Sequence, residues 1–85
     1  MEQKRKAVAL RYDREDRAPV VVAKGMGELA EKIIKIAKRE GVPIVEDREL
    51  TEALLRVEVL EEIPPVLYEA VARVLVFIQG LDRKP

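Results

Sequence analysis

A glycine-rich run at residues 25–30 is the part of the chain whose spacing points most directly to chemistry. Its sequence, GMGELA, fits the pattern G-x-G-x-x-G/A, in which glycines let the backbone approach a pyrophosphate at the start of a helix. Glu46 and Asp47 follow about 20 residues later, where a dinucleotide-binding domain places an acid on a ribose hydroxyl. On spacing alone, the motif predicts a nucleotide site at a helix N-terminus.

Three features of the same sequence argue against nucleotide binding. Glu28 would place a negative charge in the first helical turn, where the phosphate should lie. A chain of 85 residues is too short for the remaining strands of a dinucleotide domain, and it contains no His or Cys to act on a substrate. We therefore interpret Gly25 and Gly27 as turn and helix N-terminal residues, and keep a small dinucleotide- or phosphate-binding domain as the alternative.

The residue types missing from the chain exclude most catalytic chemistry. There is no Cys, His, Trp, Ser or Asn, and Thr51 is the only aliphatic hydroxyl. Nucleophilic triads, zinc sites, haem sites and disulfides therefore have no residues to form them. The adjacent acids at positions 46–47 and 61–62 lack a basic phosphate clamp, so we interpret them as solvated charges. The sequence predicts a protein that is not an enzyme and has no cofactor or metal.

Length and composition favour one small soluble domain spanning residues 1–85, with short tails at 1–6 and 80–85. The apolar and charged fractions, 48% and 38%, are those of a chain that folds. The charged N-terminus is not followed by the apolar run of a signal peptide. The most apolar stretch, residues 66–78, contains Glu69 and Arg73 and is too short to span a bilayer. We expect a cytoplasmic protein.

Opposite charges are separated along the chain although the net charge is zero. Residues 1–41 contain eleven Lys and Arg against seven Asp and Glu, whereas residues 42–69 contain two against eight. Such a distribution suits docking onto charged protein surfaces better than nucleic acid, and the alternative interpretation is ordinary solvation of the surface. Few aromatic residues accompany the basic ones, so nucleic-acid binding is not expected.

Hydrophobic periodicity predicts an α/β fold with the order β-β-α-β-α-α. Alternation at residues 7–12 and a β-branched run at 19–23 predict two strands. An amphipathic pattern from residue 26 to 39, stopped by Gly41 and Pro43, predicts a helix. A short apolar run at 43–46 predicts a third strand, parallel to its predecessor through a right-handed crossover. The expected sheet is small and mixed, with about three strands and three packed helices.

Two further helices are predicted in the second half of the chain. Asp47 can cap the first of them, and the second begins after Pro64 and ends near Gln79. The last helix has more apolar residues than one face can bury. Its predicted core residues are Leu67, Ala70, Val71, Val74 and Ile78. Its remaining apolar residues are Val66, Ala72, Val76 and Phe77, which either pack on a second layer or form a surface for a partner or a second copy.

Beyond these patterns, five blocks of sequence resemble one protein family. The blocks are residues 7–13, 17–27, 30–33, 41–47 and 67–75. In combination they are similar to the cytoplasmic C-terminal domain of the flagellar export switch protein FlhB and of its injectisome relatives such as YscU. The resemblance extends from residue 7 to about residue 79, and it accounts for the glycine pair without a nucleotide.

The chain departs from this family at its N-terminus. Family members carry a four-helix membrane domain upstream and an Asn-Pro-Thr-His sequence in which the asparagine cyclises and splits the chain. Here the corresponding residues are 2–5, Glu-Gln-Lys-Arg, which cannot perform that reaction. The resemblance therefore implies a stand-alone counterpart of the cleaved C-terminal fragment, without self-processing and without the strand that precedes the cleavage loop.

The resemblance also implies a function in type III protein export. The expected partners are the FlhB membrane domain, other cytoplasmic gate components, and export substrates or chaperones, without direct membrane insertion. The expected location is the cytoplasm, either free or peripheral at the export apparatus on the inner membrane. A family patch that receives a short substrate segment matches Ala18, Pro19, Ala72 and Leu75. A regulator that titrates a partner protein is the other alternative.

Overall fold

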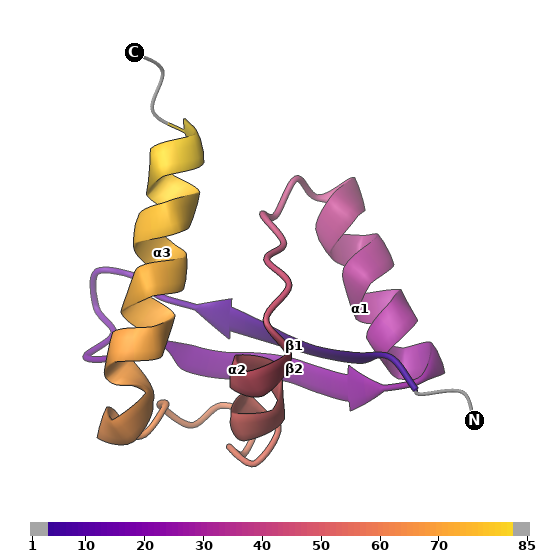
Figure 1. The fold of residues 1–85 in the computed structure, drawn as a ribbon, viewed down its shortest axis with the longest axis horizontal. Coiled ribbons are helices and arrows are strands. Elements are labelled where there is room, and N and C mark those ends of the chain that lie inside the picture. The colour runs from indigo at the N-terminus through magenta and orange to yellow at the C-terminus, as the bar shows by residue number, and fades with distance from the viewer. Residues whose placement is uncertain (1–3, 83–85) are drawn as a thin grey trace.

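The computed structural model describes residues 4–82, except for the side chains of residues 81 and 82. Two strands are followed by two α-helices, a short 3-10 helix and a long C-terminal helix (Figure 1). The elements are β1 Lys6–Arg11, β2 Val20–Met26, α1 Glu28–Arg39, α2 Arg48–Leu54, η1 Pro65–Leu67 and α3 Tyr68–Asp82.

The strands β1 and β2 form an antiparallel hairpin whose two faces differ in side-chain size. Val8 and Leu10 of β1 pack against the main core, as their alternation predicts. The opposite face carries small residues that pair directly across the strands, Ala7 with Gly25 and Ala9 with Ala23. Helix α1 contacts both strands and buries Ala30 completely, because small residues on the sheet allow a close approach.

A β-bulge interrupts the register of the hairpin. Ala9 lies opposite Ala23, but Leu10 lies opposite Val21, so Val22 is the extra residue on β2. A bulge bends the strand and increases its twist locally. Because of this shift, Val21 shares a face with Leu10 and enters the core, where it is fully buried.

The predicted third strand at residues 43–46 is wrong. These residues have no regular structure, Val42 and Ile44 are about half exposed, and no parallel crossover forms within residues 4–82. Pro43 has no N–H to donate to a ladder. The free edge of β2 is instead bonded by a segment much later in the chain.

Residues 60–63 occupy that edge of β2. The Leu60 N–H donates to the Val21 carbonyl (2.6 Å), and the Val21 N–H donates to the Glu61 carbonyl (3.0 Å). The Ile63 N–H donates to the Pro19 carbonyl (2.9 Å), and Val20 and Glu62 form an antiparallel bridge. β2 is therefore the central strand, with β1 on one edge and this short segment on the other.

The helix boundaries follow the predicted capping residues. After α1, the Val42 N–H bonds to the Ala37 carbonyl (2.8 Å) and the Gly41 N–H to the Lys38 carbonyl (3.3 Å), with Gly41 at φ +74°. This is a Schellman ending, which favours glycine. Asp47 caps α2 by accepting a hydrogen bond from the Leu50 N–H (3.1 Å).

Both predicted tails are shorter than expected within the described residues. Lys6 already belongs to β1, and α3 continues through Asp82 instead of ending near Gln79. Residues 1–3 and 83–85 of those tails lie outside the described residues.

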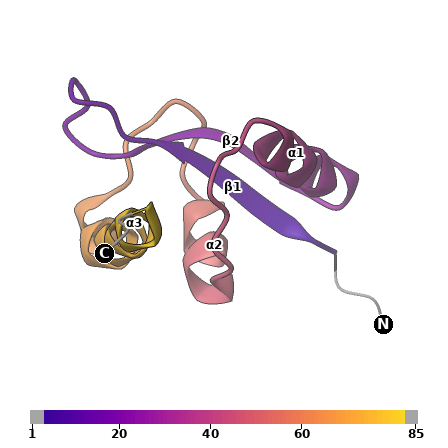
Figure 2. The ribbon, with the colours of Figure 1, turned by 90° about the horizontal axis from the view of Figure 1, so that it is seen from above.

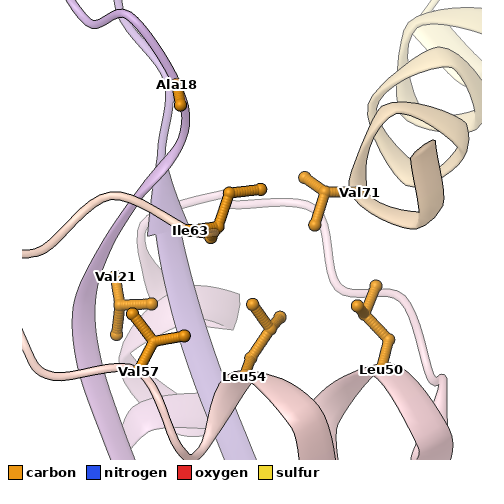
Figure 3. Close-up of a cluster of buried hydrophobic side chains, with 7 residues drawn as sticks. All are labelled: Ala18, Val21, Leu50, Leu54, Val57, Ile63 and Val71. Carbon is orange, nitrogen blue, oxygen red and sulfur yellow. The ribbon is translucent and has the colours of Figure 1, made fainter. Parts of the chain in front are cut away.

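The main core lies on one face of the hairpin, between the strands, α2 and α3, whereas α1 covers the other face (Figure 2). Its buried members are small or medium aliphatic side chains (Figure 3). They are Ala18, Val21, Leu50, Leu54, Val57, Ile63 and Val71. The predicted core stripe is confirmed at Leu67 of η1 and at Ala70, Val71 and Val74 of α3, whereas Ile78 is half-buried outside this cluster.

The loop between β1 and β2 is held by charged side chains. Asp16 accepts hydrogen bonds from the Arg11 guanidinium (3.2 Å) and from the Asp13 N–H (2.9 Å). These bonds, that from Arg11 first, hold the pKa of Asp16 below its usual range. These bonds shape the loop that leads to Ala18 and Pro19, the two residues just before β2.

Lys24 fixes α2 to β2. Its ammonium group donates to the carbonyls of Leu55 (2.9 Å) and Val57 (2.8 Å), just beyond the last residue of the helix. A cation at the C-terminal end of a helix also interacts favourably with the negative end of the helix dipole. One half-buried side chain therefore joins the central strand to the helix that closes the core.

We expect Lys24→Met to lower the free energy of unfolding by roughly 2 kcal/mol, because two charge-assisted hydrogen bonds are lost while the aliphatic stem is kept. Urea unfolding measures the change. Lys32→Met, at an exposed position of α1, is the control and should change stability by less than about 0.5 kcal/mol. Equal effects in the two variants would show that the Lys24 bonds do not hold α2.

Candidate functional site

The glycine pair performs two structural tasks. Gly27 is the N-cap of α1 at φ +65°, a conformation that L side chains rarely adopt, and its N–H donates to the Arg5 carbonyl (2.7 Å). A Cβ atom added to Gly25 would lie 2.4 Å from Cγ and 2.9 Å from Cβ of Leu29. The first glycine thus lets α1 approach β2, and the second turns the chain into the helix.

The surroundings of the glycine motif do not match those of a nucleotide site. A dinucleotide motif needs two parallel strands joined through the helix, whereas residues 4–82 contain one antiparallel pair. Glu46 lies in the segment between α1 and α2 rather than at the end of a neighbouring strand. Asp47 already accepts a hydrogen bond as the cap of α2. These observations favour the structural interpretation of Gly25 and Gly27.

Ala18 and Pro19, two of the four predicted patch residues, lie inside the domain. Ala18 is 2% exposed and belongs to the core cluster, and Pro19 is also buried. The Pro19 carbonyl accepts the bond from Ile63 that closes the edge of β2. In Figure 3, Ile63 and Val71 of the same cluster point toward one another. Ala18 and Pro19 therefore lie below the surface of the domain rather than on it.

Ala72 and Leu75, the other two patch residues, lie on α3. Ala72 is exposed, and Leu75 is half-buried against the cluster that contains Ala18. Residues three apart in a helix are neighbours on its surface, so Ala72 and Leu75 lie side by side. The structure thus brings Leu75 and Ala18 to one cluster and leaves Ala72 at the surface beside Leu75.

An apolar surface extends from Ala72 along α3. A shallow hollow is lined by Ala72, Val76 and Phe77, with Glu69 and Arg73 paired at its rim (2.8 Å). Val76 and Phe77 are 67% and 56% exposed, so the apolar excess predicted for this helix is present at the surface. An exposed surface of this apolar character suits contact with another protein.

Leu60 is an exposed residue that sequence reasoning missed. It is 72% exposed at φ +75°, a conformation that costs a bulky residue energy. The turn is held because the Leu60 N–H bonds to Val21. Leucine has no preference for this conformation, so no local pattern marks the position in the sequence.

A family model covers most of this arrangement. The model described as the FlhB HrpN YscU SpaS Family matches residues 4–78, which include the hairpin, the glycine pair, the patch residues and most of α3. The chain belongs to this family. The resemblance drawn from the five sequence blocks is confirmed.

Similar sequences include one of comparable length and several much longer ones. The protein named "Uncharacterized protein YlqH" of Bacillus subtilis is 53% identical over 79 residues, covering 92% of this chain and 85% of the relative. The flagellar biosynthetic protein FlhB of Aquifex aeolicus is 46% identical over 80 residues, covering 92% of this chain but 23% of that protein. The chain therefore spans less than a quarter of that FlhB.

Solved structures of cytoplasmic family domains have the same fold. The cytoplasmic domain of FlhB from Shewanella putrefaciens superposes with a TM-score of 0.87 at 33% identity, covering 94% of this chain and 73% of that one. The PscU C-terminal domain superposes with a TM-score of 0.82 at 37% identity, covering 86% and 95%. None of the helices in residues 4–82 combines the length and the apolar character needed to span a bilayer.

Replacing Gly25 tests its assigned structural task. Gly25→Ala should destabilise the domain by about 1–3 kcal/mol, because the new Cβ overlaps Leu29 and pushes α1 away from the sheet. Shortening the exposed partner in the double variant Gly25→Ala plus Leu29→Ala should recover at least part of the loss. Thermal unfolding of the single and double variants measures both effects. A harmless Gly25→Ala, or a double variant with no recovery, would contradict the close-approach role.

Proposed function

We propose that the chain is a non-enzymatic protein-interaction module of the flagellar type III export apparatus, equivalent to the cleaved C-terminal part of FlhB. The observation that carries the proposal is the superposition of 94% of the chain on the cytoplasmic domain of an FlhB. The chain contains no asparagine, so it cannot perform the asparagine cyclisation that splits family members. We therefore propose that the chain acts by binding other proteins and not by catalysing a reaction.

The proposed substrate-recognition patch is formed by Ala18, Pro19, Ala72 and Leu75. Ala72 and the exposed part of Leu75 would contact a short apolar segment of an export substrate. Ala18 and Pro19 would define the shape of the contact from below, since Ala18 packs in the cluster that supports Leu75. The neighbouring exposed residues Val76 and Phe77 would extend the contact. An apolar segment buried here gains free energy from the area that it covers.

The proposed partners follow from the same assignment. The module would dock on the membrane domain of FlhB and on other cytoplasmic gate components, and it would receive export substrates or their chaperones. Its place would be the cytoplasm, peripheral to the export apparatus at the inner membrane. The separation of basic and acidic segments along the chain supports docking on charged protein surfaces.

Charges placed on two adjacent positions of α3 test the patch. Ala72→Asp should abolish capture of purified hook-class export substrates and lower the unfolding free energy by less than about 1 kcal/mol, since Ala72 is exposed. Val71→Asp should cost several kcal/mol, because it buries an unpaired charge at a position that is 1% exposed. Pull-down and thermal melting separate recognition from stability.

Val66→Asp serves as the matched control, because Val66 is 83% exposed but lies on another side of this helical segment. It should keep both substrate capture and stability. Unchanged substrate capture by a folded Ala72→Asp protein would contradict the proposed patch, as would an equal loss of capture in the Val66→Asp control.

A further inference from the structure

A second surface lies at the opposite end of the hairpin from α3 (Figure 1). A hollow between Arg5 and α1 is lined by Arg5, Glu31, Ile34, Lys35 and Lys38. Arg5, Lys35 and Lys38 are exposed, and Ile34 is half-buried below them. The hollow is therefore basic, with an apolar wall.

The cations of this hollow have no partners among the described residues. Some other basic side chains of residues 4–82 are paired, among them Lys6 with Glu52, Arg11 with Asp16, and Arg73 with Glu69. Arg5, Lys35 and Lys38 form no ion pair or side-chain hydrogen bond with a described residue. Among the described residues that line the hollow, Glu31 is the one with an opposing charge.

The backbone that carries these cations is held in place. The Arg5 carbonyl accepts the bond from the Gly27 N–H (2.7 Å), which fixes the backbone of residue 5 at the start of α1. Lys35 and Lys38 are three residues apart on one helix, so they project from the same side of it. Binding here would need little ordering of the main chain, which favours affinity.

The arrangement of the charges selects the class of ligand. Glu31 would repel a compact dianion such as phosphate, but an extended chain can place separate carboxylates on Arg5, Lys35 and Lys38. The exposed apolar residues of α1, Leu29 and Ile36, lie on the other flank of the helix. An anionic membrane would need cations and apolar anchors on one outward face, so a membrane fits less well.

We propose that the hollow between Arg5 and α1 binds an acidic, extended segment of a partner protein, with an apolar residue of that segment against Ile34. This site is separate from the patch on α3 and does not depend on it. The two surfaces would let one domain hold two different chains at once.

The test uses a fluorescein-labelled peptide that repeats Glu-Leu-Glu-Gly, with a Gln-Leu-Gln-Gly repeat as the uncharged control peptide. Fluorescence anisotropy should show binding of the acidic peptide alone, weakening as salt is added. Lys35→Gln plus Lys38→Gln should weaken binding by about fivefold or more. Lys32→Gln plus Arg39→Gln removes the same charge from the outward side of α1 and should weaken binding by less than about twofold. Glu31→Gln should strengthen it.

Four results would overturn the proposal. The first is absence of binding by the acidic peptide, and the second is equal weakening in both double variants, which indicates diffuse attraction rather than a site. The third is binding of phosphatidylglycerol vesicles that depends on Lys35 and Lys38 while the peptide does not bind. The fourth is self-association in sedimentation velocity that Lys35→Gln plus Lys38→Gln removes, since the hollow would then hold a second copy. Substrate capture by the α3 patch should be unchanged in the Lys35→Gln plus Lys38→Gln variant.

Discussion

Hydrogen bonding along both edges of β2 is the constraint on which the rest of the structure depends. β1 bonds one edge, and residues 60–63 bond the other through Val21 and Pro19. The second set of bonds ties the chain after α2 to the strand before α1, so the core closes around Val21. Lys24, from the same strand, holds the end of α2. Without these bonds, α2 and α3 would have no fixed surface on which to pack.

This closure also determines which surfaces remain available. The core is small, so α3 buries one stripe and leaves Val76 and Phe77 exposed beside Ala72. On the other face of the sheet, small residues let α1 pack closely. The basic residues Lys35 and Lys38 of α1 then remain exposed beside Arg5. The proposed contacts on the surface of α3 therefore use Ala72, Val76 and Phe77, which lie outside the core, and a charge placed on them should affect binding more than stability.

The sequence predicted the features that depend on local periodicity and capping. The alternation of Val8 and Leu10, the stop at Gly41 and the cap at Asp47 are all present, because each follows from neighbouring residues. The third strand was wrong because a local pattern cannot show that residues 60–63 reach β2 first. The acidic residues at 61–62 carry no strand signal, and Leu60 has no preference for positive φ. Likewise, the burial of Ala18 depends on Ile63 and Val71, which are distant in sequence.

The central claim is that this chain can act as the C-terminal part of FlhB, and genetic complementation tests it most directly. The chain would be produced in a flagellated bacterium whose FlhB ends before its C-terminal domain, and secretion of hook protein would be measured. The account predicts that secretion returns with the wild-type chain but not with Ala72→Asp. It would be contradicted if the wild-type chain restored nothing while the host's own FlhB C-terminal domain, supplied separately at the same level, restored secretion.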